Sequence, residues 1–197
     1  MIIMIDNKDS FTYNLVDYLQ VESTTEMTVI DIDDVHIDTI EAMSPQAIVI
    51  SPGPGTPDDY PALYAVLEAF KGRVPILGVC LGFQCIVSYF GGDIVKSPRP
   101  VHGETTRIRH TGKSVYRSLP ETFEVMRYHS LTAARDTLPN ELEITAENDT
   151  ALIMGVMHKT YCIHAVQYHP ESILSMYGHE QIRNFLMEAG VHVANRV

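Results

Sequence analysis

Apolar runs and segments of helical period alternate along the first half of the chain. Residues 47–50 (AIVI) are continuously apolar, as is typical of a strand buried on both faces of a parallel sheet. The pattern predicts strands at 1–5, 27–32, 47–50 and 74–79, and helices at 12–20, 60–70 and 81–90. Strand and helix in regular alternation predict an α/β fold: an open, doubly wound, mainly parallel sheet with helices on both faces.

From about residue 93 the pattern changes to short, strand-like pieces separated by turn residues. The pieces are GETTRIRH, FEVMRY, ELEITAEN, ALIMGVMH and YCIHAVQYH. They predict a smaller antiparallel sheet in the second half. The tail, residues 178–190, has apolar residues at helical spacing and ends on Gly190, as expected just after a helix. No repeat or linker interrupts the pattern, so we expect one domain over residues 1–197.

Composition and charge narrow the possible partners. The 197 residues are 45% hydrophobic and 20% charged, a globular composition. Fourteen Lys and Arg against 25 Asp and Glu give a formal charge of −11, which repels phosphate backbones and anionic lipids. The one basic stretch, residues 107–117, has the alternation of an exposed hairpin. We therefore expect neither a nucleic-acid nor a membrane partner.

The compartment follows from the cysteines and the apolar segments. The cysteine count is odd and no export signal precedes the first strand, so we expect a cytoplasmic protein. No apolar window approaches the length of a membrane span.

Cys80 stands between Gly78 and Gly82, where an apolar strand meets a predicted helix. Small neighbours allow the sharp strand–turn–helix of a nucleophile elbow, here with sulfur in place of oxygen. A helix N-terminus also favours the thiolate. A buried core cysteine is the commoner role for an isolated cysteine, and we assign Cys85 and Cys162 to it. A core position needs no glycine on both sides, so Cys80 is the candidate nucleophile.

A general base is offered by the segment QYHPES, residues 167–172. Pro170 favours an extended backbone at His169, and residues two apart in an extended segment point the same way. Glu171 can therefore orient the His169 imidazole. His102 and His129, which lie in loops, are second-tier candidates.

The segment SPGPGTP, residues 51–57, directly follows a buried strand. Gly53 and Gly55 are held between prolines and make a stiff loop with free N–H groups, although an ordinary strand-to-helix turn has the same composition. We expect the Gly53 and Leu81 N–H groups to form an oxyanion hole. This loop and Cys80 both follow strand ends, where open parallel sheets bind their ligands.

Metal binding is not expected, because no pair of His or Cys residues has convincing ligand spacing.

Five motifs occur in order along nearly the whole chain: DNKDSFTYNL, SPGPGTP, GVCLGFQ, YHSL and YHPES. Together they resemble the triad-type, class I glutamine amidotransferases, most closely the glutaminase components of anthranilate and aminodeoxychorismate synthases. The resemblance implies Cys80 as nucleophile, His169 as general acid and base, and Glu171 as the orienting carboxylate. It implies Gly53 and Leu81 as oxyanion donors. It implies that glutamine is held by Gly53, Gly55, Gln84, Ser130 and Leu131.

Function and partner follow from the same resemblance. It implies hydrolysis of L-glutamine through a cysteinyl thioester, with no cofactor, and delivery of ammonia to a chorismate-using synthase subunit in a heteromeric complex. The segment 7–13 would lie near that subunit. Either the tryptophan or the folate branch, or both, could be served.

This chain departs from the family pattern at two positions. Phe83 stands where the family usually has histidine, and Glu104 where it usually has lysine. Phe83 lies outside the triad, so we expect glutamine hydrolysis to survive. Glu104 puts partner contacts of its loop in more doubt.

Two other functions remain open from the sequence. One is a non-catalytic regulatory or binding homologue of the same fold, which the intact triad argues against. The other is a cysteine hydrolase of a different γ-glutamyl amide, which Gln84 and the Ser130–Leu131 pair disfavour.

Overall fold

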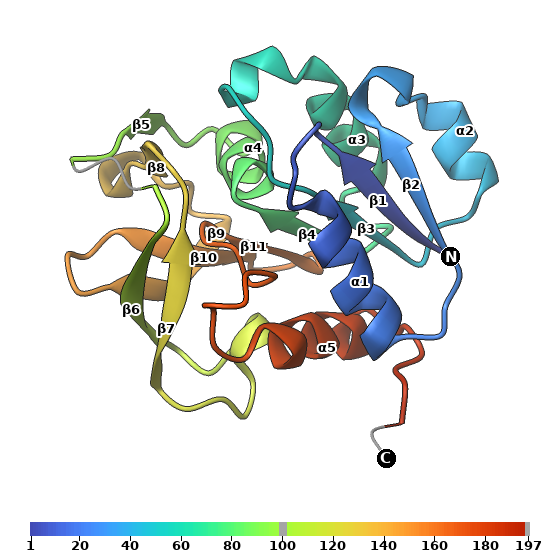
Figure 1. Ribbon diagram of the computed structural model, residues 1–197. Helices are drawn as coiled ribbons and strands as arrows, with labels where there is room; N and C mark the ends of the chain where they lie inside the picture. Colours follow the sequence, from blue (N-terminus) through green and yellow to red (C-terminus); the bar gives the residue numbers. More distant parts are fainter. Residues whose placement is uncertain (99–101, 196–197) are drawn as a thin grey trace.

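The computed structural model describes residues 1–98 and 102–195, and within them a nine-stranded sheet forms the centre of the molecule (Figure 1). The strand order is β2-β1-β3-β4-β11-β10-β9-β6-β7, and a separate two-stranded sheet pairs β5 with β8. The strands are β1 Ile2–Asp6, β2 Met27–Asp31, β3 Ala47–Ile50, β4 Ile76–Val79, β5 Ile94–Lys96, β6 Glu104–His110, β7 Thr122–Arg127, β8 Leu131–Ala133, β9 Leu142–Asn148, β10 Ile153–His158 and β11 Ile163–Val166.

Strand direction divides the large sheet into two halves. The neighbours β2, β1, β3, β4 and β11 are parallel to one another, while β10, β9, β6 and β7 continue the sheet in antiparallel pairs. The predicted mainly parallel, doubly wound sheet is thus present, and β5–β8 is a small antiparallel sheet. Most of the antiparallel strands extend the large sheet, and β11 lies parallel to β4 inside it.

Helices cover both faces of the parallel half (Figure 1). The helices α1 (Thr12–Glu22) and α5 (Gly178–Glu188) pack on one face. The helices α2 (Ile37–Ala42), α3 (Pro61–Phe70) and α4 (Leu81–Tyr89) pack on the other. Alternate residues of β1 serve the two cores: Ile2 and Met4 face the first, whereas Ile3 and Ile5 face the second. These two cores fix the parallel strands, whose ends carry the site.

The predicted strands and helices of the first half occur within two residues of their expected bounds. The short helix α2 was not predicted. Gly190 has φ +69°, as expected for the residue that follows a helix end. The basic stretch is not a fully exposed hairpin, because the single turn η3 (Ser114–Tyr116) inside it is buried. Among the described residues, no helix is both long and apolar enough to cross a bilayer.

Candidate active site

The carboxyl ends of the parallel strands gather the candidate residues at one edge of the sheet. Asn7 follows β1, Ser51 follows β3, Cys80 follows β4, and Gln167 follows β11. Parallel strands in register end at the same edge, so segments far apart in sequence meet there. The site expected from the sequence therefore lies at the expected edge.

Cys80 sits at a sharp turn between β4 and α4. Its φ of 54° and ψ of −97° place it in a region that residues other than glycine rarely occupy. The turn is held on both sides, since the Cys80 N–H donates to the Val166 carbonyl at 2.8 Å and the Gln84 N–H donates to the Cys80 carbonyl at 3.1 Å. The residue is 6% exposed, and its thiol stands at the N-terminus of α4. This is the elbow geometry that the sequence predicts.

The flanking glycines are required by close backbone contacts. A Cβ on Gly78 would lie 2.6 Å from the Gly82 backbone, and one on Gly82 would lie 2.6 Å from the Ile50 carbonyl oxygen. Helix α4 can therefore approach β3 and β4 only with glycine at both positions. This close approach places the N-terminus of α4 directly after the cysteine.

His169 and Glu171 are paired as expected. The His169 Nδ1 lies 2.6 Å from the Glu171 Oε1, and both side chains are buried. The backbone of His169 is fixed by its N–H, which donates to the Met126 carbonyl at 3.0 Å, and by its carbonyl, which accepts from the Ser175 hydroxyl. Within the described residues, Nε2 is buried without a hydrogen-bond partner. The imidazole is thus held at Nδ1 and left open at Nε2.

The charge state of His169 reflects a balance of burial and partners. Burial alone lowers the pKa of His169, but the Cys80 thiol and the Glu171 carboxylate outweigh it and hold the pKa well above its usual value. Both groups favour the imidazolium form. Cys80, His169 and Glu171 therefore interact within one buried group, in which the His169 Nε2 makes no hydrogen bond to the described residues.

The loop after β3 is fixed against the turn after β1. The Asn7 N–H donates to the Ser51 hydroxyl at 2.9 Å, and the Asn7 side-chain amide donates to the Ser51 carbonyl at 2.8 Å. A Cβ on Gly53 would lie 2.6 Å from both Asn7 and Leu81 side-chain atoms. Gly55 has φ +76°. Gly53 therefore packs against Leu81, the first residue of α4, and lines the same cavity as Cys80.

A cavity of about 160 Å³ opens on the thiol. Its lining residues are Gly53, Pro54, Gly55, Cys80, Gln84, Tyr128, His129, Ser130 and Leu131. Every residue expected to hold substrate is among them. The volume is below the roughly 300–1,000 Å³ of drug-sized sites, so the cavity suits a ligand about the size of an amino acid. A larger hollow, about 480 Å³, lies beside β6 and β9 and includes none of the triad.

Polar groups in the cavity wall are held in fixed directions. The Gln84 side-chain amide lies 3.4 Å from both the Leu131 carbonyl and the Gln167 side-chain oxygen. His129 accepts from Arg127 at Nε2, 3.0 Å, and its Nδ1 lies 2.8 Å from the Leu131 carbonyl. Burial and the Arg127 guanidinium lower the pKa of His129 to about 4, so this ring is neutral. It supports the cavity wall through its contacts with Arg127 and Leu131.

Sequence reasoning missed three side chains that contact the candidate triad. The Gln167 amide donates to the Cys80 sulfur at 3.8 Å. The sequence contains a signal for this contact. Gln167 lies two residues before His169, so the two side chains point the same way in an extended segment. Phe11 and Tyr128 pack against His169 with ring centroids 5.2 Å away in each case. Nothing local in the sequence indicates those ring contacts.

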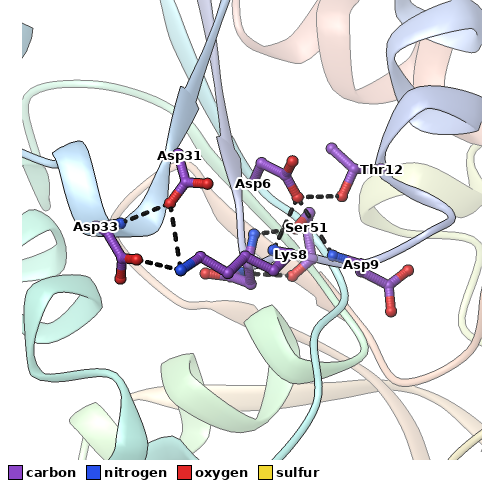
Figure 2. Close-up of polar contacts among 8 residues, drawn as sticks. Asp6, Lys8, Asp9, Thr12, Asp31, Asp33 and Ser51 are labelled. Carbon is purple, nitrogen blue, oxygen red and sulfur yellow. Dashed lines mark hydrogen bonds and ion pairs between the residues drawn. The ribbon is translucent and has the colours of Figure 1, made fainter.

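The turn after β1 carries Phe11 and belongs to the segment expected near a partner. Figure 2 shows its anchoring: Asp6 accepts from the Thr12 hydroxyl at 2.7 Å and from the Lys8 N–H at 2.9 Å. Lys8 has φ +61° and extends its ammonium to Asp31, the last residue of β2, and to Asp33 in the turn after it (Figure 2). The turn is therefore tied to the sheet edge and presents Phe11 to His169.

The remaining singled-out positions do not line the cavity. Phe83 lies on α4 and is fully buried in the core that α4 shares with α2 and α3. Glu104 is exposed at the start of β6. The His102 ring packs on Tyr128 with centroids 5.5 Å apart.

Cys85 is fully buried and burial raises the pKa of its thiol to about 12, as expected of a core cysteine. Cys162 is only partly buried, so its core assignment is wrong.

Comparisons with known proteins agree on one family. Residues 3–189 match the model of the family described as glutamine amidotransferase class-I. The chain is 47% identical to anthranilate synthase component 2 of Pseudomonas aeruginosa, over 96% of each chain. It is 45% identical to aminodeoxychorismate/anthranilate synthase component 2 of Bacillus subtilis, over 94% of this chain and 95% of that one. It is also 45% identical to aminodeoxychorismate synthase component 2 of Escherichia coli, over 94% and 99%.

Solved structures share the fold. A crystal structure from Thermoplasma acidophilum, described as a subunit of GMP synthase, superposes with a TM-score of 0.83 at 27% identity, over 96% of this chain and 93% of that one. A glutamine amidotransferase from Thermotoga maritima, 14% identical, shares the fold with a TM-score of 0.76 over 95% and 96%. The chain belongs to the class I glutamine amidotransferase family.

Proposed function

We propose that this protein is a glutaminase subunit that hydrolyses L-glutamine to glutamate and delivers the ammonia to a chorismate-aminating synthase subunit. The observation that carries the proposal is the thiol of Cys80, which lines an amino-acid-sized cavity at a strained elbow and interacts with the buried His169–Glu171 pair. Residues 1–197 would form one glutaminase domain, because a single sheet runs between the two cores.

In the first step the Cys80 thiolate attacks the side-chain carboxamide carbon of glutamine. The tetrahedral oxyanion is stabilised by the Gly53 and Leu81 N–H groups. Loss of one such donor typically costs about 10²- to 10³-fold in rate. Gly53 packs on Leu81, so the two donors are held in a fixed relation before substrate binds.

In the second step His169, in its imidazolium form, protonates the departing nitrogen. The C–N bond breaks, ammonia leaves, and a γ-glutamyl thioester remains on Cys80. His169 then takes a proton from water and the hydroxide attacks the thioester carbon. The C–S bond breaks, glutamate is released and the thiolate is regenerated. Glu171 keeps the imidazole oriented through both steps. No step requires a metal or an organic cofactor.

Glutamine recognition is assigned to the cavity wall. Gly55, Gln84, Ser130 and Leu131 surround the space beside the thiol together with Gly53. The Gln84 amide is oriented by the Leu131 carbonyl and by Gln167, so it presents a fixed polar group to the substrate. A small cavity with fixed polar groups favours glutamine over larger amides.

The synthase partner would bind beside the triad. Relatives named as component 2 of anthranilate or aminodeoxychorismate synthase imply a second component that uses the ammonia. Two residues after Glu171 begins an exposed apolar patch formed by Ile173, Leu174 and Met176, with Ile173 93% exposed. Exposed apolar side chains grouped in this way are typical of protein interfaces. The patch and the turn bearing Phe11 both adjoin His169. Binding of the partner to these surfaces can therefore affect the imidazole.

The acidic balance suits an ammonia donor whose acceptor binds elsewhere. Chorismate is a dianion, and a chain of net charge −11 would repel it. We propose that chorismate binds the partner, and that the product is anthranilate, aminodeoxychorismate or both.

The proposal is tested by a complex of this chain with its synthase partner. Cys80→Ser should abolish glutamine-dependent amination of chorismate and leave ammonium-dependent amination unchanged, because only the glutaminase step needs the sulfur. Cys85→Ala, which removes a thiol in the core, should retain both activities. Glutamine-dependent activity in the Cys80→Ser complex would contradict the proposal.

A further inference from the structure

A second group of cysteine, histidine and carboxylate side chains lies at the opposite edge of the sheet from Cys80. Cys162 and His164 are at the start of β11, and Glu188 is the last residue of α5. β11 runs parallel to β4, so its carboxyl end leads to His169 and its amino end carries this group. The glutaminase mechanism uses none of the three residues.

The three side chains converge on one point. The Cys162 Sγ lies 3.6 Å from the His164 Nε2, which lies 3.2 Å from the Glu188 Oε1. One ligand atom from each residue falls within 4.8 Å of the other two. In a tetrahedral zinc site, with bonds of about 2.0–2.3 Å, neighbouring ligand atoms lie about 3.3–3.6 Å apart. The two measured distances are close to those values.

The imidazole of His164 is oriented for coordination through Nε2. Its Nδ1 lies 2.5 Å from the Ser114 hydroxyl, and the ring is almost completely buried. Ser114 is in turn fixed by the turn η3, where the Asn184 amide of α5 donates to the Val115 carbonyl at 2.9 Å. A metal-bound histidine usually donates its other N–H to such a partner, which leaves the first nitrogen free for the ion.

Glu188 and Cys162 complete the set and leave a way in. The second carboxylate oxygen of Glu188 lies 3.4 Å from the Arg117 guanidinium, so Oε1 can face an ion while Oε2 is held. Cys162 is partly exposed, and the Glu188 side chain is 31% exposed. An ion could therefore reach the group from solvent without opening the core.

We propose that Cys162, His164 and Glu188 form a zinc site, with water as the fourth ligand. The Cys162 thiol loses its proton to solvent when its sulfur binds zinc, and the ion replaces the contact between the His164 Nε2 and Glu188. A thiolate and an imidazole favour zinc over magnesium or calcium. The ion would join the start of β11 to the end of α5, away from Cys80.

We expected no metal site because no pair of His or Cys residues has ligand spacing along the sequence. The proposed site does not depend on such spacing. Cys162 and His164 are two apart, so an extended strand places them on one side. The third ligand comes from the end of a helix that only the fold brings near.

Zinc titration of the metal-free full chain tests the proposal. The Cys80→Ser variant is used as the parent, so that the active-site thiol does not bind the ion. Calorimetry should give one zinc per chain, with an increase in melting temperature. Cobalt in place of zinc should give a thiolate-to-cobalt charge-transfer band and the visible spectrum of a tetrahedral site.

Matched variants separate this site from adventitious binding. In the same parent, Cys162→Ala and His164→Gln should weaken zinc binding by at least about tenfold, and Ser114→Ala by about 10- to 100-fold. Cys85→Ala should leave zinc affinity unchanged. Failure of the parent to bind zinc, or cobalt binding without the thiolate band, would overturn the proposal even if a variant failed to fold. So would equal zinc affinity in the parent and a folded Cys162→Ala variant.

Discussion

Cys80 and His169 are each held in a state that would be unfavourable elsewhere in the chain. A positive φ at a residue other than glycine costs of order 1–3 kcal/mol, and it persists at Cys80 because Gly78, Gly82 and the Val166 carbonyl leave the backbone no alternative. The imidazolium form of the buried His169 persists because Cys80 and Glu171 both favour it. Conformation and charge are thus set by immediate neighbours.

Removing the Glu171 charge should weaken catalysis through His169. We expect Glu171→Gln to lower glutaminase kcat by about 10²- to 10⁴-fold, because general acid–base catalysis contributes that much and the imidazole loses its anchor. The pKa of His169 should fall, since burial lowers it and one of the two groups that raise it is gone. Histidine resonances followed over a pH titration measure this pKa. An unchanged pKa with wild-type kcat would show that Glu171 does not act on the ring.

His129 makes the fold sensitive to acid. Its pKa in the folded state is about 4, below the ordinary value of 6.5, so the unfolded chain binds a proton more readily between these pH values. Its contribution to stability is therefore complete above pH 6.5 and is lost as pH falls towards 4, at up to about 1.4 kcal/mol per pH unit. Urea unfolding at several pH values should show a smaller loss for His129→Gln than for the wild type. Equal losses would contradict this assignment.

At the scale of elements, the site depends on how closely α4 approaches the sheet. Gly82→Ala would place a Cβ 2.6 Å from the Ile50 carbonyl oxygen, so α4 must shift and carry the Cys80 elbow with it. We expect a stability loss of about 1–3 kcal/mol, together with loss of glutaminase activity.

Gly91→Ala is the matched control. Gly91 has φ +99° and open space around a Cβ, so the added methyl costs only backbone strain, about 1–2 kcal/mol. Denaturant unfolding and glutaminase assays should therefore show comparable stability losses, with activity lost only in Gly82→Ala. Full activity in a folded Gly82→Ala protein would refute the requirement for close approach.

The sequence predicts those elements whose signals are local. The strand Ala47–Ile50 was predicted with its observed bounds because a continuous apolar run needs burial on both faces. The pairing of β11 with β4 was not predicted, because alternation within a strand does not reveal its neighbour. The same limit applies to the site. Cys80, His169 and Glu171 carry short-range signals, whereas the packing of Phe11 on His169 arises only when the segments that follow β1 and β11 come together.

At the scale of the whole molecule, the two sheet edges have different roles. One edge carries the thiol, the cavity and the exposed apolar patch of Ile173, Leu174 and Met176. The other carries the proposed zinc site at Cys162. β11 (Ile163–Val166) connects the two edges, with Cys162 before its first residue and His169 beyond its last.

The apolar patch should be part of the partner interface. Ile173→Asp and Leu174→Asp should weaken binding to the synthase subunit by about tenfold or more, because buried apolar anchors at interfaces are each worth about 2 kcal/mol. Met187→Asp, an exposed apolar position on α5, should leave binding unchanged. Affinity is measured with the purified subunits, and thermal unfolding checks that each variant is folded. If neither patch variant weakens binding, the partner docks elsewhere.

The central claim is that the Cys80 sulfur forms a covalent bond with the side-chain carbonyl carbon of glutamine. Intact-protein and peptide mass spectrometry of the complex, treated with an electrophilic diazoketone analogue of glutamine, tests it directly. We expect one adduct per chain, located on Cys80, slowed by glutamine and absent from Cys80→Ser. No adduct would indicate a non-catalytic homologue, and an adduct protected by another amide but not by glutamine would indicate a different hydrolase; either result would contradict the claim.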